Sequence, residues 1–158
     1  MRRRTYLLLG RLAGPFAIMG LNLYSLITGR PRVRVLVTNE KREVLLMRGV
    51  LSRGRKWSLP GGGVNRHESP QAAARRELHE ETGIDKPLRE FSYIRTIAKS
   101  DLGLSFEVPV FHIKVVKNNL PKALYNPIEV AEIAWFRPDK LPLERTKLID
   151  FVLNEFDV

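Results

Sequence analysis

The chain has 158 residues, which is enough for one domain with a buried core and too few for two ordinary domains. Apolar residues make up 44% of the chain and charged residues 28%, a balance that excludes a disordered protein. Cysteine is absent, which excludes disulfides, thiolate metal sites and a cysteine nucleophile, and which fits a reducing compartment such as the cytoplasm.

The net charge of +10 is concentrated near the N-terminus. Residues 1–56 contain 13 Lys and Arg against two acidic residues, whereas residues 57–158 contain 14 against 15. Such a basic region suits a solvated or membrane-proximal surface as well as one that attracts nucleotides, nucleic acid or anionic lipid. Charge alone therefore indicates a general class of partner and identifies no single one.

Residues 1–29 form a leader that differs from the rest of the chain. Residues 6–27 are mostly apolar, are interrupted by Arg11, Pro15 and Asn22, and have arginines at both ends. The uninterrupted apolar part is short for a spanning helix of about 20 residues, and no clear signal-peptide cleavage site follows it. Two interpretations stay open: a helix packed on the domain or on a second subunit of a homodimer, and an anchor at the inner face of a membrane. The flanking charge slightly favours membrane association.

Residues 30–158 carry the pattern of a single α/β domain. Alternating and continuous apolar runs predict strands at residues 32–38, 44–47, 57–60, 92–98, 105–115 and 132–136. Helices are predicted from Pro70 to Thr82, between Ser69 as N-cap and Gly83 as C-terminal stop, and over residues 144–156. This order of strands and helices predicts a mixed sheet with helices on its faces.

The first predicted helix carries three glutamates within five positions, Glu77, Glu80 and Glu81. Residues three and four apart are neighbours on a helix, so each like-charged pair costs a few tenths of a kcal/mol. Arg75, Arg76 and solvent could compensate this charge on an outer face. A hard divalent cation such as Mg²⁺ or Mn²⁺, which prefers oxygen ligands, is the other compensation.

A run of three glycines, Gly61–Gly63, precedes this helix and favours the metal site. Glycines let the backbone approach a ligand closely, whereas three in a row weaken a purely structural loop. The loop and the helix are each weak signals by themselves, and their spacing is what makes them specific.

Nine positions at fixed offsets match the signature of the Nudix hydrolase family, which this sequence therefore resembles. They are Gly62, Glu68, Arg76, Glu77, Leu78, Glu80, Glu81, Gly83 and Ile84. Residues 57–62 also resemble the family's usual approach to the motif. The signature covers residues 62–84, a looser likeness extends over about 32–156, and the leader has no counterpart.

The resemblance implies a Nudix fold, an α/β/α sandwich around a mixed β-sheet, and hydrolysis of a nucleoside diphosphate linked to another group with the help of Mg²⁺ or Mn²⁺. By position it implies Glu77 and Glu81 as metal ligands, with Glu80 as a further ligand or a base. The carbonyl of Gly61 would join the metal shell. Arg76 would orient the glutamates through a charge-assisted hydrogen bond.

Two acidic residues outside this cluster have alternative roles. Glu68 lies just before the helix, where a role in capping or fixing the loop competes with a catalytic one. Many members of the family recruit one more glutamate before the last strand, and Glu129 is favoured over Glu132 because Glu132 adjoins the strand.

The expected partner is a nucleotide-type small molecule. Basic residues before the glycine run, Arg48, Arg55 and Lys56, together with Gly62, are the candidate substrate-binding residues. An RNA 5′ end would suit the same charge but is not favoured. A module that senses a nucleotide without cleaving it is the other class, although such proteins usually lack some of the glutamates that are intact in this sequence. The base and the linked group lie beyond what the signature specifies.

Overall fold

The computed structural model describes residues 31–49, 56–104, 106–116 and 130–156. The predicted leader at residues 6–27 lies outside this part of the chain, as do Arg55 and Glu129. Within the described residues, no helix combines the length and the apolar character needed to cross a membrane.

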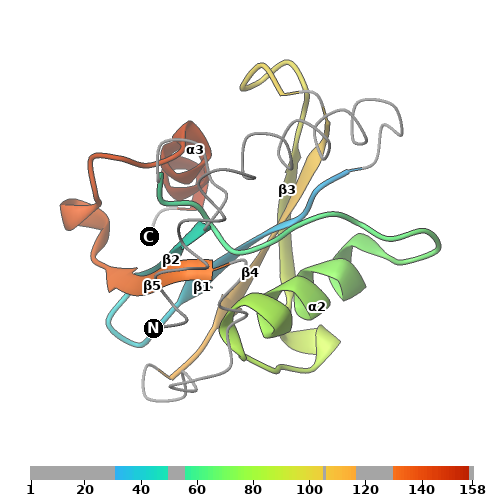
Figure 1. Cartoon of the computed structure of the whole chain (residues 1–158), viewed down its shortest axis with the longest axis horizontal. Coiled ribbons are helices and arrows are strands. Elements are labelled where there is room, and N and C mark those ends of the chain that lie inside the picture. Colours follow the sequence, from blue (N-terminus) through green and yellow to red (C-terminus); the bar gives the residue numbers. More distant parts are fainter. Residues whose placement is uncertain (1–30, 50–55, 105, 117–129, 157–158) are drawn as a thin grey trace, which may run out of the picture.

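Five strands form one mixed sheet (Figure 1). They are β1 (Arg34–Thr38), β2 (Val44–Gly49), β3 (Ser92–Ile97), β4 (Val108–Lys114) and β5 (Val130–Phe136). Their order is β3-β4-β1-β2-β5, with β1 parallel to β4 and the other neighbours antiparallel. The predicted mixed sheet is confirmed, and the strand boundaries differ from the expected ones by a few residues.

The strand predicted at residues 57–60 forms isolated bridges instead of a regular strand. β1 and β2 are paired where Thr38 faces Val44, and the segment before α2 then lies between them. Ser58 exchanges backbone hydrogen bonds with Met47, and the carbonyl of Pro60 accepts one from the Val35 amide at 2.9 Å. Proline has no N–H to donate, so a regular ladder cannot continue through it. The result is a glycine run fixed directly against β1.

The helix α2 (Pro70–Thr82) has the predicted boundaries. The Ser69 hydroxyl accepts a hydrogen bond from the Ala72 amide at 3.1 Å, and Gly83 ends the helix with a left-handed backbone of φ 73°. Both ends are thus set by residues whose local preferences are readable in the sequence.

The helix α3 (Lys147–Phe156) begins three residues after the predicted start at residue 144. The cause is a tertiary contact with Trp57, whose amide donates to the Glu144 carbonyl at 2.8 Å and whose carbonyl accepts from the Thr146 amide at 2.9 Å. These bonds hold residues 144–146 in an extended bridge. Short 3₁₀ turns, η2 (Leu88–Glu90) and η4 (Pro138–Lys140), complete the described elements.

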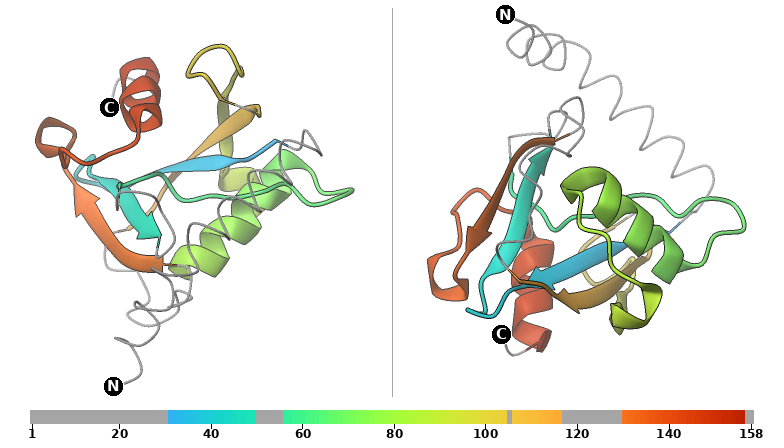
Figure 2. Two further views of the ribbon diagram at one scale, coloured as in Figure 1. Left: turned by 45° about the horizontal axis from the view of Figure 1, so that its top comes forward. Right: turned by 90° about the horizontal axis from the view of Figure 1, so that it is seen from below.

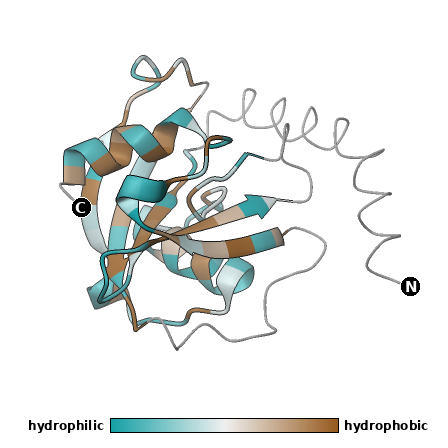
Figure 3. Ribbon diagram, turned by 90° about the vertical axis from the view of Figure 1, so that its left-hand side faces the viewer, coloured by the Kyte–Doolittle hydropathy of each residue, from teal (hydrophilic) through white to brown (hydrophobic). Residues whose placement is uncertain are grey.

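The two helices cover opposite faces of the sheet (Figure 2). Alternation along β1 sends Val35 and Val37 to the core beneath α2, and Leu36 to the core beneath α3. Hydrophobic and hydrophilic residues also alternate along α3 (Figure 3), and its Ile149 and Val152 are buried against the sheet. This arrangement confirms the expected α/β/α sandwich.

Candidate functional site

The glycine run and the acidic helix meet in the structure. Glu81 Oε2 accepts a hydrogen bond from the Gly61 amide at 2.7 Å. Gly61 has φ 133°, and a Cβ there would collide with the Val33 carbonyl on β1. Only glycine fits a backbone with this angle and this approach. The loop is therefore held between β1 on one side and the last turn of α2 on the other.

Glu77 contacts the same loop one helical turn before Glu81. A Cβ at Gly62 would lie 2.5 Å from the Glu77 carboxyl group, so the absent side chain leaves room for this glutamate. The Glu77 side chain is only 15% exposed. Burial raises the pKa of Glu77, while its hydrogen bond from Arg76 and the charges of Arg76 and Arg34 oppose that rise. A carboxylate in such a place favours a positive partner.

Arg76 ties the helix to the loop. Its Nε and Nη2 donate to the two carboxylate oxygens of Glu68, both at 2.9 Å, and Nη1 donates to Glu77 Oε1 at 2.8 Å. Nη2 also donates to the Gly63 carbonyl at 2.9 Å. The hydrogen bond from Arg76 lowers the pKa of Glu68. Arg76 thus lies where it can orient Glu77, in the manner that the resemblance implies.

Glu68 lies where it can fix the loop. Besides its two bonds from Arg76, it accepts a hydrogen bond from the Asn65 amide at 2.9 Å. Glu80 lies at the edge of the same cluster: its carboxylate is 3.3 Å from Arg76 Nη1, and its side chain is 50% exposed. Glu80 is therefore more accessible to solvent than Glu77.

Arg34 is a site residue that the sequence analysis did not identify. It begins β1 and is partly buried, and its Nη1 donates to the Gly61 carbonyl at 2.6 Å and to the Val33 carbonyl at 2.9 Å. Burial lowers the pKa of Arg34 to about 10, with a further lowering from Arg32, while the charges of Glu81 and Glu77 act in the opposite direction. The group still carries its charge at neutral pH. A weak signal was present in the sequence, because an arginine interrupts a run of strand residues that are otherwise buried.

The donor groups suit a hard divalent cation. Glu77 and Glu81 supply carboxylates and Gly61 supplies a carbonyl, all oxygen ligands of the kind that Mg²⁺ and Mn²⁺ prefer. The Gly61 carbonyl already binds a cationic group, the guanidinium of Arg34. Nevertheless, among the described residues no three acidic or histidine side chains converge closely enough to hold a metal ion. The structure therefore presents the predicted donors without bringing all three glutamates together.

The predicted substrate-binding residues and the second acidic candidate lie in different places. Arg48 forms an ion pair with Glu132 across β2 and β5, and its guanidinium lies 4.7 Å from the centroid of the Trp57 ring. Lys56 is exposed. Because Arg55 and Glu129 lie outside the described residues, the predicted preference for Glu129 over Glu132 stays a prediction.

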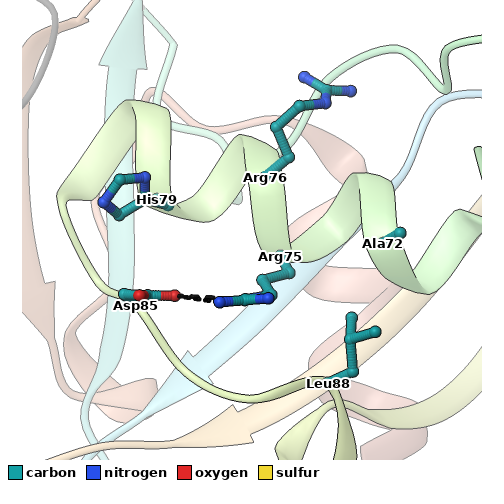
Figure 4. Close-up of a pocket in the computed structure, with 6 residues that line it drawn as sticks. All are labelled: Ala72, Arg75, Arg76, His79, Asp85 and Leu88. Carbon is teal, nitrogen blue, oxygen red and sulfur yellow. Dashed lines mark hydrogen bonds and ion pairs between the residues drawn. The ribbon is translucent and has the colours of Figure 1, made fainter.

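A shallow pocket lies on another side of α2 (Figure 4). It is lined by Ala72, Arg75, Arg76, His79, Asp85 and Leu88. Arg75 and Asp85 form an ion pair of 3.0 Å across it. Glu77 and Glu81 are not among its lining residues, and Arg76 is the residue that this pocket shares with the contact between the glycine run and α2.

Comparison with known proteins connects this geometry to a family. A family model described as the NUDIX domain matches residues 28–153. An RNA pyrophosphohydrolase of Ruthia magnifica subsp. Calyptogena magnifica is 36% identical over 85 residues, covering 54% of this chain and 44% of the relative. The m7GpppN-mRNA hydrolase dcap-2 of Caenorhabditis elegans is 30% identical over 115 residues, covering 71% of this chain and 14% of the relative. The chain thus spans less than half the length of these curated relatives.

Solved structures share the fold. A MutT NUDIX hydrolase from Burkholderia pseudomallei has a TM-score of 0.66 at 23% identity, covering 80% of this chain and 96% of that one. A NUDIX hydrolase from Nitrosomonas europaea has a TM-score of 0.65 at 20% identity, covering 81% and 88%. At such identities the similarity establishes the architecture, and the chemistry has to be argued from the residues.

Proposed function

The chain belongs to the NUDIX domain family, and we propose that it hydrolyses a pyrophosphate bond in a nucleoside diphosphate linked to a further group. The proposed cofactor is Mg²⁺ or Mn²⁺. One observation carries the proposal. Glu77 and Glu81, one turn apart on α2, both reach the backbone of the glycine run, where Glu81 accepts from the Gly61 amide at 2.7 Å.

The residues have distinct tasks in this proposal. Glu77, Glu81 and the Gly61 carbonyl would hold the metal ion, which would supply charge to neutralise the phosphates and would lower the pKa of a water molecule. Arg76 keeps the Glu77 carboxylate oriented through its 2.8 Å hydrogen bond. Glu80, which is half exposed and pairs with Arg76 at 3.3 Å, would serve as a further ligand or as the base.

The substrate proposed is a nucleotide or nucleotide derivative. Relatives named as an RNA pyrophosphohydrolase and as an mRNA hydrolase add weight to the RNA alternative, in which the basic region would follow a phosphate backbone. However, the Arg48 guanidinium is engaged by Glu132 and Trp57, which leaves it less available for phosphates. We therefore keep the small nucleotide as the first choice and Arg55, Lys56 and the Gly62 backbone as its candidate contacts.

A substrate screen tests the proposal. The full chain is incubated with Mg²⁺ or Mn²⁺ and with nucleoside triphosphates, nucleotide sugars, dinucleoside polyphosphates, and triphosphorylated or capped RNA, and the products are separated by ion-exchange chromatography. Metal-dependent cleavage of a phosphoanhydride bond in a small nucleotide is the expected result. Cleavage of RNA alone, with a steep dependence on salt, would establish the RNA alternative. Binding of nucleotides without any turnover would establish the sensing module.

We also propose that the protein is cytoplasmic and that residues 6–27 attach it to the inner, cytoplasmic face of a membrane. The support is the sequence alone: an apolar run with arginines at both ends, and a chain without cysteine. Flotation of the full chain with anionic liposomes, compared with residues 30–158, is the test. A full chain that stays at the bottom of the gradient would favour the packed helix or a homodimer contact.

A further inference from the structure

We propose that Arg34 is a built-in counter-cation of the metal site: in the metal-free protein its guanidinium occupies the Gly61 carbonyl, and it must leave that carbonyl when a divalent ion binds. This inference rests on the proposed function, because it takes the Gly61 carbonyl to be a metal ligand. It assigns to β1 a role in setting how tightly the site binds its cation.

The Gly61 carbonyl is the atom for which Arg34 and a metal ion would compete. The 2.6 Å bond from Arg34 Nη1 is short for an N–H···O contact and directs a charged donor at the oxygen atom. A metal ion would approach the same oxygen at about 2.0–2.2 Å. The carbonyls on either side of it, those of Pro60 and Gly62, accept hydrogen bonds at 2.9 Å from the amides of Val35 in β1 and of Val33 just before it, so the peptide unit that carries the Gly61 carbonyl is held from both sides. The oxygen therefore has a fixed direction, for which the two cations compete.

The charges around the acidic face of α2 also favour this role for Arg34. Three glutamates stand on one face of α2, and Arg76 is shared among Glu68, Glu77 and Glu80. Glu77 is mostly buried, and the charges of both Arg76 and Arg34 favour its ionised form. Without a metal ion, Arg34 is the positive group of β1 that acts on both Glu77 and Glu81. The metal-free site is thus partly neutralised by the chain itself.

Arg34 also occupies a position in the fold where an unpaired charge is costly. Its backbone lies in the middle strand of the sheet, opposite Val110 of β4, between neighbours that are fully buried. A charged side chain in such a strand is costly unless it is paired. The Val33 and Gly61 carbonyls supply hydrogen-bond acceptors, but two carbonyls carry no full negative charge, so the nearby glutamates complete the compensation. A side chain retained only for packing would be apolar at this position.

Two consequences differ from those of a purely structural arginine. Arg34→Met removes the competing cation, so the site should bind Mn²⁺ more tightly, by about tenfold, which corresponds to about 1.4 kcal/mol. The same change leaves the Gly61 carbonyl without its donor and removes one of the positive charges that act on Glu77 and Glu81, so the metal-free protein should melt several degrees earlier. A structural role alone predicts the lower melting temperature but no gain in affinity.

The experiment measures Mn²⁺ binding by electron paramagnetic resonance of the free ion and thermal melting with chelator or with saturating Mn²⁺. It compares the parent with Arg34→Met, Arg34→Lys, Glu81→Gln and the control Arg75→Met. Arg75 is an ion-paired arginine on another side of α2 (Figure 4), so its variant removes the same charge without touching the glycine run. Arg34→Lys keeps the charge, and it gives a second test if the methionine variant does not fold.

The expected result is tighter Mn²⁺ binding and lower metal-free stability for Arg34→Met, an intermediate affinity for Arg34→Lys, and parental values for Arg75→Met. If Glu81→Gln weakens Mn²⁺ binding while Arg34→Met and Arg34→Lys bind like the parent, this inference is overturned and the proposed function stands. The inference is also overturned if Arg34→Met binds Mn²⁺ no more tightly than Arg75→Met does. If the parent binds no Mn²⁺, both the metal site and the role of Arg34 are overturned.

Discussion

The guanidinium of Arg76 donates hydrogen bonds to four oxygen-bearing groups, three carboxylates and one backbone carbonyl. Arg76→Ala removes the donors to Glu68, Glu77 and the Gly63 carbonyl and leaves a mostly buried Glu77 carboxylate without its ion pair. Losing charge-assisted bonds to such a group should reduce the free energy of unfolding by about 2–3 kcal/mol.

Chemical denaturation measures this change, with Arg75→Ala as the matched control. Arg75 pairs with Asp85, but the side chains are 43% and 59% exposed, so its loss should cost less than about 1 kcal/mol. Equal losses for the two neighbouring arginines would contradict the network described above.

The glycine run gives a second prediction, based on three adjacent positions with different surroundings. A Cβ at Gly62 meets the flexible end of Glu77 at 2.5 Å, whereas a Cβ at Gly63 meets no atom within 4 Å. Gly62→Ala should therefore push the Glu77 carboxylate away and weaken Mn²⁺ binding by about tenfold or more, with a modest effect on folding. Gly63→Ala should bind Mn²⁺ like the parent. A Gly62→Ala protein with unchanged affinity would mean that Glu77 is not a ligand.

Gly61 behaves differently, because the obstacle there is backbone. Its φ of 133° and the collision with the Val33 carbonyl leave no room for any side chain. Gly61→Ala should destabilise the whole domain by more than about 2 kcal/mol, and a melting curve that matches the Gly63→Ala variant would contradict this close approach.

At the scale of the elements, β4 and α3 meet at His112. Its Nε2 lies 2.8 Å from the Thr38 hydroxyl, and its ring centroid lies 4.4 Å from that of Phe156. Burial lowers the pKa of His112 from its ordinary value of 6.5, with a smaller effect of Lys114. Folding therefore favours the neutral ring, so this contribution to stability is present above pH 6.5 and is lost as the pH falls through the folded-state pKa.

His112→Gln should flatten this dependence. The unfolding free energy of the parent should fall with decreasing pH below about 6.5, by at most about 1.4 kcal/mol per pH unit from this group, and the variant should lose that component. Urea titrations between pH 5 and 7.5 measure it. The exposed His79→Gln serves as control, and an unchanged slope in the His112 variant would show that another group governs the acid side.

Some elements could be predicted from the sequence and some could not, for identifiable reasons. The N-cap Ser69 and the C-terminal Gly83 directly flank α2 in the sequence, so both predicted ends of this helix are confirmed. The start of α3 was wrong because Trp57, about 90 residues earlier, binds residues 144 and 146. The pattern of residues 57–60 predicts a regular strand, whereas in the structure these residues form isolated backbone contacts with β1 and β2, which lie outside this stretch of the sequence.

The candidate site divides in the same way. The contacts of Glu68, Arg76, Glu77 and Glu81 follow from spacing on one helix and one loop, which the sequence displays directly. Arg34 lies 27 positions before the Gly61 carbonyl that it binds, and this contact exists only because the glycine run is inserted beside β1. Residues that are close in the chain or that belong to a known motif can be identified from the sequence. A residue such as Arg34, which reaches the site only through the folding of the sheet, cannot.

At the scale of the whole molecule, the sandwich explains why the site is where it is. β1 lies between β4 and β2, residues 33–35 are hydrogen-bonded to residues 60–62, and the two helices cover opposite faces of the sheet (Figure 2). The acidic face of α2 therefore lies against the glycine run, a backbone segment that is itself hydrogen-bonded to β1. Rigid placement of donors of this kind is what metal-assisted cleavage requires.

Metal-dependent hydrolysis with Glu81 as a ligand is tested most directly by the rate of phosphoanhydride hydrolysis by Glu81→Gln. The rate is measured on the best substrate at saturating Mg²⁺. Glutamine preserves the size of the side chain and its acceptor for the Gly61 amide but removes the charge that would hold the ion. The control is Glu90→Gln, whose partly exposed side chain pairs with Lys86 away from the loop. If Glu81 is a metal ligand, kcat should fall by about 10²-fold or more in Glu81→Gln and stay at the parental rate in Glu90→Gln. Parental turnover and parental Mg²⁺ affinity in Glu81→Gln would contradict this role.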